Sequence, residues 1–514
     1  MIKTVLYINI YLNRLRFNLY FNGRFMKNNV QLITYVDRLT GSGVQALDNI
    51  LHNQLSGLFS GVHLLPFYYP IDGSDAGFDP IDHTEVDSRL GDWENVKTLG
   101  ESHELMADLI VNHMSAQSKE FLDVLDKGRD SPFWALFLTK DKVFPAGLSE
   151  EQQAKIYRPR PGSSFTNYLL PNNQSADFWT TFTDSQIDID VTSDVGQAYL
   201  TRILKTFAEN NINIIRLDAA GYAIKKAGTS CFMLEETFEF IDQLTQKANA
   251  QGIDTLVEIH SYYQTQIEIA KRVDQVYDFA LPPLILHSIF SQNFSALIKW
   301  LNISPRNCIT VLDTHDGIGI IDVGPMNGKK GLLDNTEIDN LVKKIHLNSA
   351  GESQKATGAA ASNVDLYQVN CTYYDALAAN DYDYLLARAI QFFAPGTPQV
   401  YYAGLFAEKN DMTLLSATNV GRDISRPYLN NQHIEKSLEK PITQAIIELI
   451  KLRNNSEAFN GDFTIEGQHS VLEMAWSHAN SQATLLVDLT ARKASIELND
   501  KGKKRFILLE SLLN

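Results

Sequence analysis

The chain has 514 residues and a formal net charge of −16, from 45 basic and 61 acidic residues. Hydrophobic residues make up 44% and charged residues 21%, a composition typical of folded globular proteins and unlike that of disordered chains. The acidic balance and the lack of a basic run argue against nucleic acid as a partner.

The first 25 residues are apolar and basic, and their role is open. Polar and charged side chains, among them Asn13 and Arg14, interrupt the apolar residues, so the segment predicts neither a membrane span nor a signal peptide. A second methionine stands at position 26, just before the first strand-like pattern. We interpret residues 1–25 as an extension that precedes the folded part of the chain.

From Met26 onward, short apolar runs alternate with longer amphipathic stretches. Strands are predicted at 30–36, 61–67, 106–113, 212–218, 255–260, 273–281 and 307–316. Helices are predicted at 44–55, 93–105, 198–211 and 236–251. Strands that alternate with helices favour a parallel α/β fold, so we expect a (β/α)8 TIM barrel, with a doubly wound sheet as the alternative.

Two irregular stretches interrupt this alternation. The first is rich in Pro, Gly, Ser and aromatic residues and is too long for a plain loop, so we expect an inserted subdomain after the third strand. Alternating segments near the C-terminus predict a small β domain. The expected parts are barrel segments 26–111, 191–317 and 380–460, subdomain B at 112–190, a second, loop-rich insertion B′ at 318–379, and the C-terminal β domain at 461–514.

The three cysteines lie far apart, at Cys231, Cys308 and Cys371. Their spacing does not match a zinc site, and an odd number does not suit a disulfide framework. Free thiols favour a reducing cytoplasm as the location of this protein.

Polar side chains stand where the predicted strands end. In a barrel of parallel strands, these C-terminal ends meet at one face and line the active site. Taken singly, Asp218 suits a helix N-cap, Glu258 suits an ion pair with Arg216, and a histidine can be a satisfied core residue. Several such residues at one register predict an active site instead. They are Asn112, His113, Arg216, Asp218, Glu258, His260, His315 and Asp316.

Two convergent carboxylates suit glycosyl transfer, in which one attacks the anomeric carbon and the other protonates the leaving oxygen. Residues two apart in a strand share a face, so the charge of Arg216 should favour the ionised form of Asp218. We expect apolar surroundings, which the stretch TLVEI offers locally, to keep Glu258 protonated.

The stretches IIRLDAAGY, LVEIHS and VLDTHDG, with DLIVNH and DAGFDPIDH, resemble the conserved regions of the alpha-amylase family, glycoside hydrolase family 13. More narrowly, QLITYVDRL, YRPRPG, AGTSCFM, VYDFALPPL, DLYQVN and GRDISR resemble the sucrose phosphorylase branch of that family. The likeness extends from about Met26 to about Phe459 and is weaker in the C-terminal domain.

The resemblance implies a reversible, retaining double displacement without a metal or organic cofactor. Asp218 would take the glucosyl group from sucrose, Glu258 would protonate departing fructose, and inorganic phosphate would then attack to give alpha-glucose 1-phosphate. Asp316 matches the transition-state stabiliser of the family. Members of the family are often homodimeric. With the exclusions drawn above from charge, cysteines and hydropathy, we expect a cytoplasmic enzyme without nucleic-acid or membrane partners.

Further residues match sugar-binding positions of the family. Those on the glucosyl side are Asp75, Phe78, His113, Arg216, His315 and Arg422, with Arg422 opposite Asp75. Those on the acceptor side are Tyr157, Arg160, Tyr222, His260, Asp365, Tyr367 and Gln368. A forked guanidinium such as that of Arg160 suits phosphate, whereas a carboxylate such as Asp365 suits sugar hydroxyls, so loops carrying both could alternate between acceptors.

Several alternatives stay open at the level of sequence. A related phosphorylase would act on sucrose 6′-phosphate, glucosylglycerol or glucosylglycerate. Enzymes for the phosphorylated sugar tend toward a basic side chain in the DLYQ loop, so Tyr367 favours unphosphorylated sucrose. Water in place of phosphate would make the protein a hydrolase. A catalytically inactive amylase-like binding protein would lack a nucleophile or acid, whereas Asp218 and Glu258 are both present.

Overall fold

The computed structural model describes residues 28–159, 162–358 and 366–514. The predicted extension at 1–25 therefore lies outside the described residues, as do Arg160 and Asp365. Within the described part of the chain, no helix combines the length and apolar character needed to cross a membrane.

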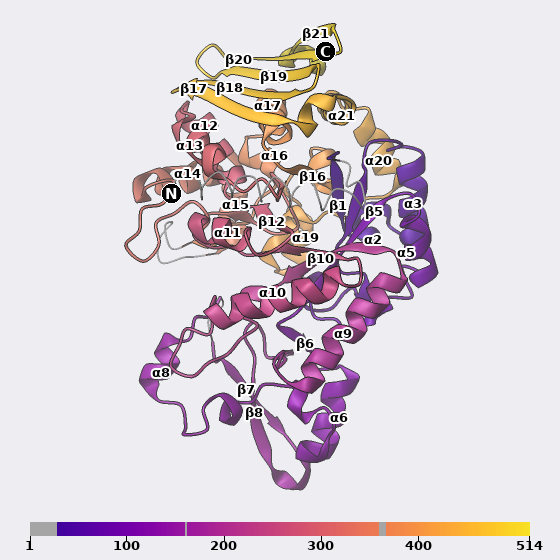
Figure 1. Cartoon of the computed structure of the whole chain (residues 1–514), viewed down its shortest axis with the longest axis vertical. Coiled ribbons are helices and arrows are strands. Elements are labelled where there is room, and N and C mark those ends of the chain that lie inside the picture. Colours follow the sequence, from indigo (N-terminus) through magenta and orange to yellow (C-terminus); the bar gives the residue numbers. More distant parts are fainter. Residues whose placement is uncertain (1–27, 160–161, 359–365) are drawn as a thin grey trace, which may run out of the picture.

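A closed barrel of eight parallel strands forms the centre of the molecule (Figure 1). The first and last strands close it, with Leu32 beside Val400. Closure leaves no unpaired strand edge. This confirms the predicted (β/α)8 TIM barrel. In chain order the barrel strands are β1 (Gln31–Thr34), β2 (Gly61–Leu64), β5 (Glu104–Ile110), β10 (Ile212–Asp218), β11 (Asp254–Val257), β12 (Gln275–Asp278), β13 (Cys308–Thr310) and β16 (Thr397–Tyr401).

Seven of these strands lie within or beside predicted runs, whereas the eighth, β16, was not predicted. Its sequence TPQVY is short and contains Pro398, a residue that usually argues against a central strand. The helix predicted at 93–105 was too long. Helix α5 (Trp93–Leu99) ends at Gly100, and β5 begins at Glu104.

Helices surround the barrel (Figure 1). Most bury one face against it, whereas α12 and α17 are buried on all sides over much of their length. In α9 the buried residues Tyr199, Ile203 and Phe207 recur every four positions, which gives the helix one apolar stripe. Its N-terminus is capped by Ser193, whose hydroxyl accepts a hydrogen bond from the amide of Gly196. The main covering helices are α3 (Val44–His52), α5, α9 (Asp194–Glu209), α10 (Glu235–Asn249), α11 (Tyr263–Ile269), α12 (Leu281–Ser291), α13 (Ser295–Ile303), α17 (Asp381–Phe393) and α21 (Pro441–Asn455).

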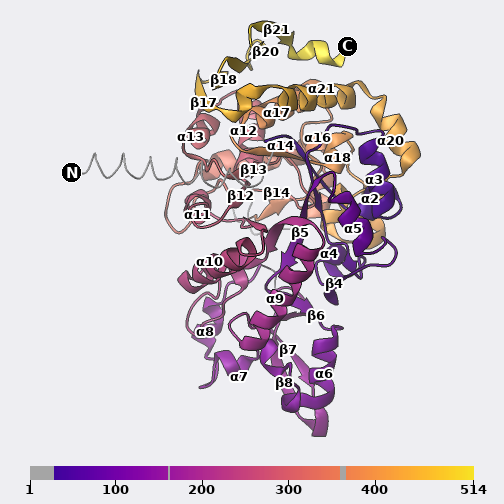
Figure 2. The same ribbon diagram turned by 45° about the vertical axis from the view of Figure 1, so that its right-hand side comes forward.

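A lobe between β5 and β10 projects from the barrel (Figure 2). Strands β6 and β9 tie its two ends together in an antiparallel pair, with His113 beside Asp188. Phe121, Phe137 and Phe178 pack edge to face in its core. The elements of the lobe are β6 (His113–Ser115), α6 (Lys119–Lys127), α7 (Lys140–Val143), α8 (Glu150–Lys155), β7 (Phe165–Leu169), β8 (Ser175–Trp179) and β9 (Gln186–Asp188).

A second insertion in the barrel lies between β13 and β16. Strands β14 (Ile318–Gly319) and β15 (Gln368–Val369) pair antiparallel, which brings residues on either side of a long helical segment together. The helices between and after them are α14 (Asn335–Asn348), α15 (Glu352–Thr357) and α16 (Tyr373–Ala376).

The C-terminal residues form a five-stranded antiparallel sheet above the barrel (Figures 1 and 2). Burial alternates along its strands, so one face packs inward, and the indole of Trp476 donates a hydrogen bond to the carbonyl of Phe393 at 2.8 Å. The predicted small β domain is confirmed. Its strands are β17 (Asp462–Gln468), β18 (Val471–His478), β19 (Ser481–Asp488), β20 (Lys493–Asp500) and β21 (Lys503–Leu508).

The remaining short elements lie in the loops. They are α2 (Val36–Thr40), β3 (Tyr68–Tyr69), α4 (Ser74–Gly77), β4 (Asp82–Val86), α18 (Tyr402–Leu405), α19 (Met412–Thr418) and α20 (Asn431–Leu438).

Candidate active site

The polar residues predicted at the strand ends meet at one end of the barrel. Arg216 and Asp218 are the last polar residues of β10, and Glu258 follows β11 directly. Arg216 pairs in register with Asp108 of β5 on one side and with Leu256 of β11 on the other. The parallel register therefore brings charges from three neighbouring strands together.

The buried guanidinium of Arg216 binds three carboxylates. Its Nη1 lies 3.2 Å from Asp218 and also contacts Asp108, and its Nη2 lies 3.0 Å from Glu258. The side chain of Arg216 is only 2% exposed, whereas those of Asp218 and Glu258 are 15% and 12% exposed. Both candidate reacting carboxylates therefore bind one cation and keep a face open.

Asp108, which the sequence analysis missed, supports Arg216 from inside the barrel. Its carboxylate also contacts Nε2 of His63 at 3.0 Å, and the hydroxyl of Tyr277 lies 3.3 Å from the other ring nitrogen of that histidine. Burial raises the pKa of Asp108, but the charges of Arg216 and His63 outweigh it and lower the pKa to about 2. The available signal was an aspartate inside an otherwise apolar strand, ELMADLI.

Burial raises the pKa of Asp218 well above its ordinary value. Arg216 acts in the opposite direction, as expected, but its effect is smaller than that of burial. The negative charges of Glu258, Asp108 and Asp316 raise the pKa further. Asp218 and Glu258 bind the same guanidinium, and the negative charge of Glu258 opposes ionisation of Asp218.

Glu258 does not lie in the apolar surroundings that its neighbours in sequence suggested. Its carboxylate contacts Arg216 at 3.0 Å and lies 3.9 Å from Nε2 of His260. Its apolar neighbours in sequence, Val257 and Ile259, are buried, but the contacts of Glu258 itself are with charged and polar groups.

Asp316 lies beside two arginines and a histidine. Its carboxylate is 2.9 Å from Nη1 of Arg422, 3.8 Å from Nη2 of Arg426 and 3.6 Å from Nε2 of His315. Burial raises the pKa of Asp316, but the nearby cations outweigh it and hold the pKa far below its ordinary range. Asp316 is therefore ionised.

The same two arginines also bind Asp75. Arg422 lies 3.0 Å from one oxygen of Asp75, which places it opposite that aspartate as expected, and Arg426 lies 3.2 Å from the other oxygen. Asp75 and Ala76 both adopt the left-handed backbone conformation, with φ of 52° and 59°. Such a conformation is costly for non-glycine residues and is often found at functional sites. Arg426 stands in the GRDISR stretch, but the sequence analysis singled out only Arg422 there.

Aromatic and histidine rings form one wall of the site. The ring of Phe78 stacks on His315 at 5.0 Å with an interplanar angle of 8°, and the guanidinium of Arg216 lies 5.5 Å from the Phe78 centroid. Nε2 of His113 lies 3.0 Å from the carbonyl oxygen of Phe78. Burial lowers the pKa of His315 well below its ordinary value, so this ring is neutral.

A second wall is aromatic and lies toward the projecting lobe. Tyr157 and Tyr222 stack at 6.2 Å, and both rings lie 4.6 Å from Phe232. Phe182 lies 5.2 Å from both Tyr222 and His113, which joins this wall to the first. Phe182 and Phe232 were not predicted, because an aromatic residue outside a charged motif carries no distinctive sequence signal.

His260 lies between Glu258 and the segment that contains Tyr367 and Gln368. Its ring stacks on Phe279 at 3.8 Å, and Tyr367 lies 5.4 Å away. Nε2 of His260 is 3.1 Å from Nε2 of Gln368. The structure thus brings together all the predicted site residues that it describes. Arg160 and Asp365 lie outside the described residues.

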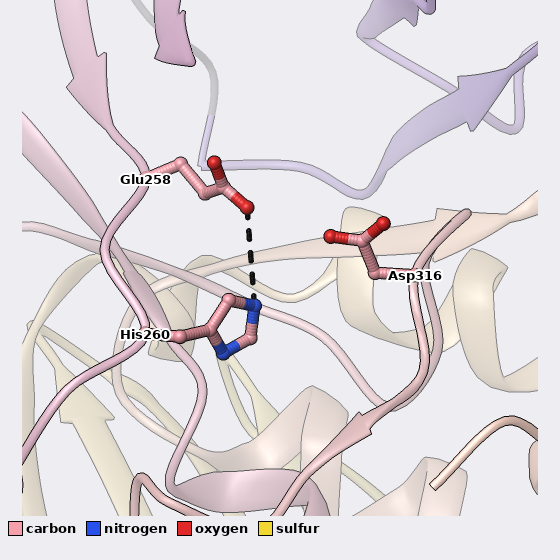
Figure 3. A group of neighbouring side chains, drawn as sticks. All are labelled: Glu258, His260 and Asp316. Carbon is pink, nitrogen blue, oxygen red and sulfur yellow. Dashed lines mark ion pairs between the residues drawn. The ribbon is translucent and has the colours of Figure 1, made fainter. Parts of the chain in front are cut away.

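Glu258, His260 and Asp316 place one potential ligand atom each within 4.8 Å of one another (Figure 3). These groups already have other partners. Arg216 binds Glu258, Arg422 binds Asp316, and both ring nitrogens of His260 face polar groups. A metal ion would compete with two guanidinium groups, so the donor set suits a neutral, hydroxyl-rich ligand better than a cation.

The arrangement is chemically suited to glycosyl transfer. Two carboxylates face the same space from neighbouring strands, and a third, ionised carboxylate stands opposite, with arginines that can bind sugar hydroxyls around it. Aromatic rings on two sides can pack against the apolar faces of sugar rings.

Comparisons with known proteins agree with this geometry. Residues 55–279 match the alpha amylase catalytic domain family. The chain is 58% identical to the sucrose phosphorylase of Agrobacterium vitis over 92% of its length and 97% of that protein. It is 50% identical to the sucrose phosphorylase of Bifidobacterium adolescentis, over 93% of this chain and 97% of that one. The crystal structure of sucrose 6F-phosphate phosphorylase from Thermoanaerobacter thermosaccharolyticum superimposes with a TM-score of 0.88 at 36% identity, covering 95% of this chain and 99% of that one.

Proposed function

The chain belongs to the alpha-amylase family, within its sucrose phosphorylase branch, and from this premise we propose that it reversibly transfers glucosyl from sucrose to inorganic phosphate. The products are alpha-D-glucose 1-phosphate and fructose. The observation that carries the proposal is the pairing of Asp218 and Glu258 on the single guanidinium of Arg216.

In the first half of the proposed reaction, Asp218 attacks the anomeric carbon of the glucosyl unit. The bond from that carbon to the fructosyl oxygen breaks, and Glu258 donates its proton to the departing oxygen. A covalent glucosyl-enzyme and free fructose result. This step needs Asp218 ionised as the nucleophile and Glu258 protonated as the acid.

In the second half, phosphate occupies the space that fructose leaves. Glu258, now ionised, takes a proton from the phosphate oxygen as that oxygen attacks the anomeric carbon, and the bond to Asp218 breaks. Two inversions restore the original alpha configuration. Tyr157, Tyr222 and Tyr367 border this space, and burial raises the pKa of Tyr367 so that its hydroxyl stays a donor. Arg160 and Asp365 belong to the same proposal through the family resemblance.

The glucosyl unit is proposed to bind between Asp75 and Asp316. The ionised carboxylate of Asp316 stabilises the positive charge that develops on the sugar ring, and Arg422 joins it to Asp75. The stacked rings of Phe78 and His315 form the wall of this subsite, with His113 beside them.

The first experiment measures product release from sucrose with and without inorganic phosphate. We expect glucose 1-phosphate to form only with phosphate, and free glucose to appear much more slowly when phosphate is omitted, because water must then replace it. Equal release of free glucose in both reactions would identify a hydrolase and contradict the proposal. Loss of all turnover of every donor would favour an inactive binding protein.

The related phosphorylases are separated by parallel assays of the same enzyme. Sucrose 6′-phosphate, glucosylglycerol and glucosylglycerate replace sucrose at equal concentration, each with phosphate. Because Tyr367 stands where a basic side chain would suit a phosphorylated sugar, we expect sucrose to be the preferred donor. A higher kcat/KM for sucrose 6′-phosphate would show that our interpretation of Tyr367 is wrong.

The pH dependence of kcat/KM tests the raised pKa of Asp218 and the contribution of the Glu258 charge to it. Protonated Asp218 cannot attack, so kcat/KM falls as the pH falls through its raised pKa, and the acidic limb should lie above pH 3.8, the ordinary value. The charge of Glu258 raises this pKa, so the limb of Glu258→Gln should move to lower pH. The measurement uses alpha-D-glucosyl fluoride, which does not titrate. If the acidic limb of kcat/KM lay at the same pH in the unchanged protein and in Glu258→Gln, the charge of Glu258 would not raise the pKa of Asp218.

The proposal also covers the location, the oligomeric state and the cofactor requirement of the enzyme. The three cysteines are free and buried, which supports a reducing cytoplasm. A homodimer is proposed from the family resemblance, and gel filtration with light scattering would measure it. No cofactor is needed in the proposed chemistry, because carboxylates supply both the nucleophile and the acid.

A further inference from the structure

A carboxylate that no part of the proposed mechanism uses lies behind His260. Asp322 is completely buried, and three donors converge on it. They are Nδ1 of His260 at 2.8 Å, the side-chain amide of Gln266 at 2.8 Å and the backbone amide of Ser261 at 3.2 Å. Among the described residues, no lysine or arginine forms an ion pair with it. A carboxylate buried in this way is costly unless its partners need it.

Hydrogen-bond polarity fixes the direction of a chain of groups that ends at Asp322. Nη2 of Arg422 can only donate, and it lies 3.2 Å from Oε1 of Gln368. The amide nitrogen of Gln368 then faces Nε2 of His260 and donates to it. Nε2 must therefore accept, so the proton of the ring sits on Nδ1, where it is donated to Asp322.

Asp322 also makes His260 a better acceptor. Burial lowers the pKa of His260, but the contact with Asp322 outweighs it, with smaller contributions from Glu258 and Asp316, and the pKa is raised. A buried carboxylate that accepts from one ring nitrogen increases the basicity of the other and fixes the orientation of the ring. That other nitrogen is Nε2, which lies 3.9 Å from Glu258 (Figure 3).

The backbone around Asp322 binds the segment that lines the acceptor side. Gly319 pairs with Gln368 across the β14–β15 ladder, and the amide of Ile320 donates to the carbonyl of Tyr367 at 3.0 Å. A Cβ at Gly319 would stand 2.2 Å from Oδ2 of Asp322, so this backbone packs directly on the carboxylate. Asp322 thus contacts His260 and packs against β14, which in turn pairs with the segment that contains Tyr367 and Gln368.

We propose that Asp322 is a positioning residue for the acceptor side of the site. It accepts from Nδ1 of His260, holds Nε2 as the acceptor for the side-chain amide of Gln368, and thereby fixes the side chain of Gln368 that borders the departing fructosyl group or the attacking phosphate. This inference rests on the proposed function, since it assigns the residue to binding and orienting the group that leaves or attacks.

The test separates the two sides of the site by the choice of donor. In Asp322→Asn we expect kcat/KM to fall about 10- to 100-fold for sucrose and for phosphate, as is typical when the partner that orients a histidine is lost. Alpha-D-glucosyl fluoride does not fill the acceptor side, because fluoride is small and leaves without a proton. The first burst of fluoride release should therefore change less than about twofold, since it needs none of the positioning described above.

A double-mutant cycle shows whether Asp322 acts through His260. If it does, Asp322→Asn should have little further effect on kcat/KM for phosphate in a His260→Gln background. Additive losses would overturn the inference, as would an equal loss with the fluoride donor. The control is Asp87→Asn, which neutralises an equally buried aspartate that accepts from the amide of Ile71 and binds Arg89.

A spectroscopic measurement tests the inference without depending on enzyme activity. Nitrogen-15 chemical shifts of labelled histidine, with His260 assigned by its loss in His260→Gln, should show protonation at Nδ1 in the unmodified protein. They should show a mixture of tautomers in Asp322→Asn. An Nε2–H tautomer in the unmodified protein would overturn the inference even if phosphorolysis is observed. The expected tautomer together with no transfer from sucrose to phosphate would instead locate the failure in the proposed function.

Discussion

Replacing Asp218 with asparagine is expected to lower turnover of sucrose by about 10⁴-fold or more, because the proposed covalent glucosyl intermediate forms on its carboxylate. Asparagine keeps the shape of the side chain. The loss should be equally large for glucose 1-phosphate and for alpha-D-glucosyl fluoride, since every donor must pass through the same intermediate. Initial rates of product release with the three donors measure the effect.

Stability distinguishes loss of chemistry from loss of fold. The pKa of Asp218 is raised in the folded protein, so its ionised form costs stability at pH values above the unfolded pKa. The asparagine side chain carries no charge, and Arg216 keeps its contacts with Asp108 and Glu258. The thermal unfolding midpoint of Asp218→Asn at pH 7 should therefore equal or exceed that of the unchanged protein. An inactive variant that unfolds at much lower temperature would leave Asp218 with a structural role instead. Asp126→Asn, an exposed change on α6, is the control.

Glu258→Gln is expected to affect donors unequally, because a general acid matters most when the leaving group is poor. For sucrose, whose fructosyl oxygen needs a proton, turnover should fall by about 10²- to 10⁴-fold. Release of fluoride from alpha-D-glucosyl fluoride needs no proton, so its first burst should be nearly unchanged. Rapid-quench or stopped-flow measurements of that burst separate the first half of the reaction from the second.

The second half gives a complementary expectation for the same variant. Phosphate arrives partly ionised and depends less on a general base than water does, so phosphorolysis of the glucosyl-enzyme should be impaired less than its hydrolysis. Equal losses for sucrose and for the fluoride donor would contradict the assignment of Glu258 as the acid. Glu94→Gln, which removes a carboxylate from the exposed face of α5, controls for the change of charge.

The barrel was accessible from sequence because its determinants are local. Apolar runs such as INIIRLD alternate with amphipathic helices, and this alternation alone predicts parallel strands. The exception, β16, carries too short and too atypical a pattern, and only the need to close the sheet between β13 and β1 defines it. The positions of Asp218 and Glu258 at the ends of strands were equally visible, whereas Asp316 lies in the loop after β13, which ends at Thr310 and is shorter than the predicted strand.

What the tertiary structure decided is how these charges are shared. The sequence places Arg216 two residues before Asp218, but only the barrel register adds Asp108 and Glu258 to the same guanidinium. Likewise, the contacts of Arg426 with Asp75 and of Asp322 with His260 join residues that lie far apart in the sequence. The physical reason is that burial and the sum of neighbouring charges set a carboxyl pKa, and both depend on residues distant in sequence. Sequence therefore determined which groups stand at the barrel mouth, and packing determined where their protons and hydrogen bonds lie.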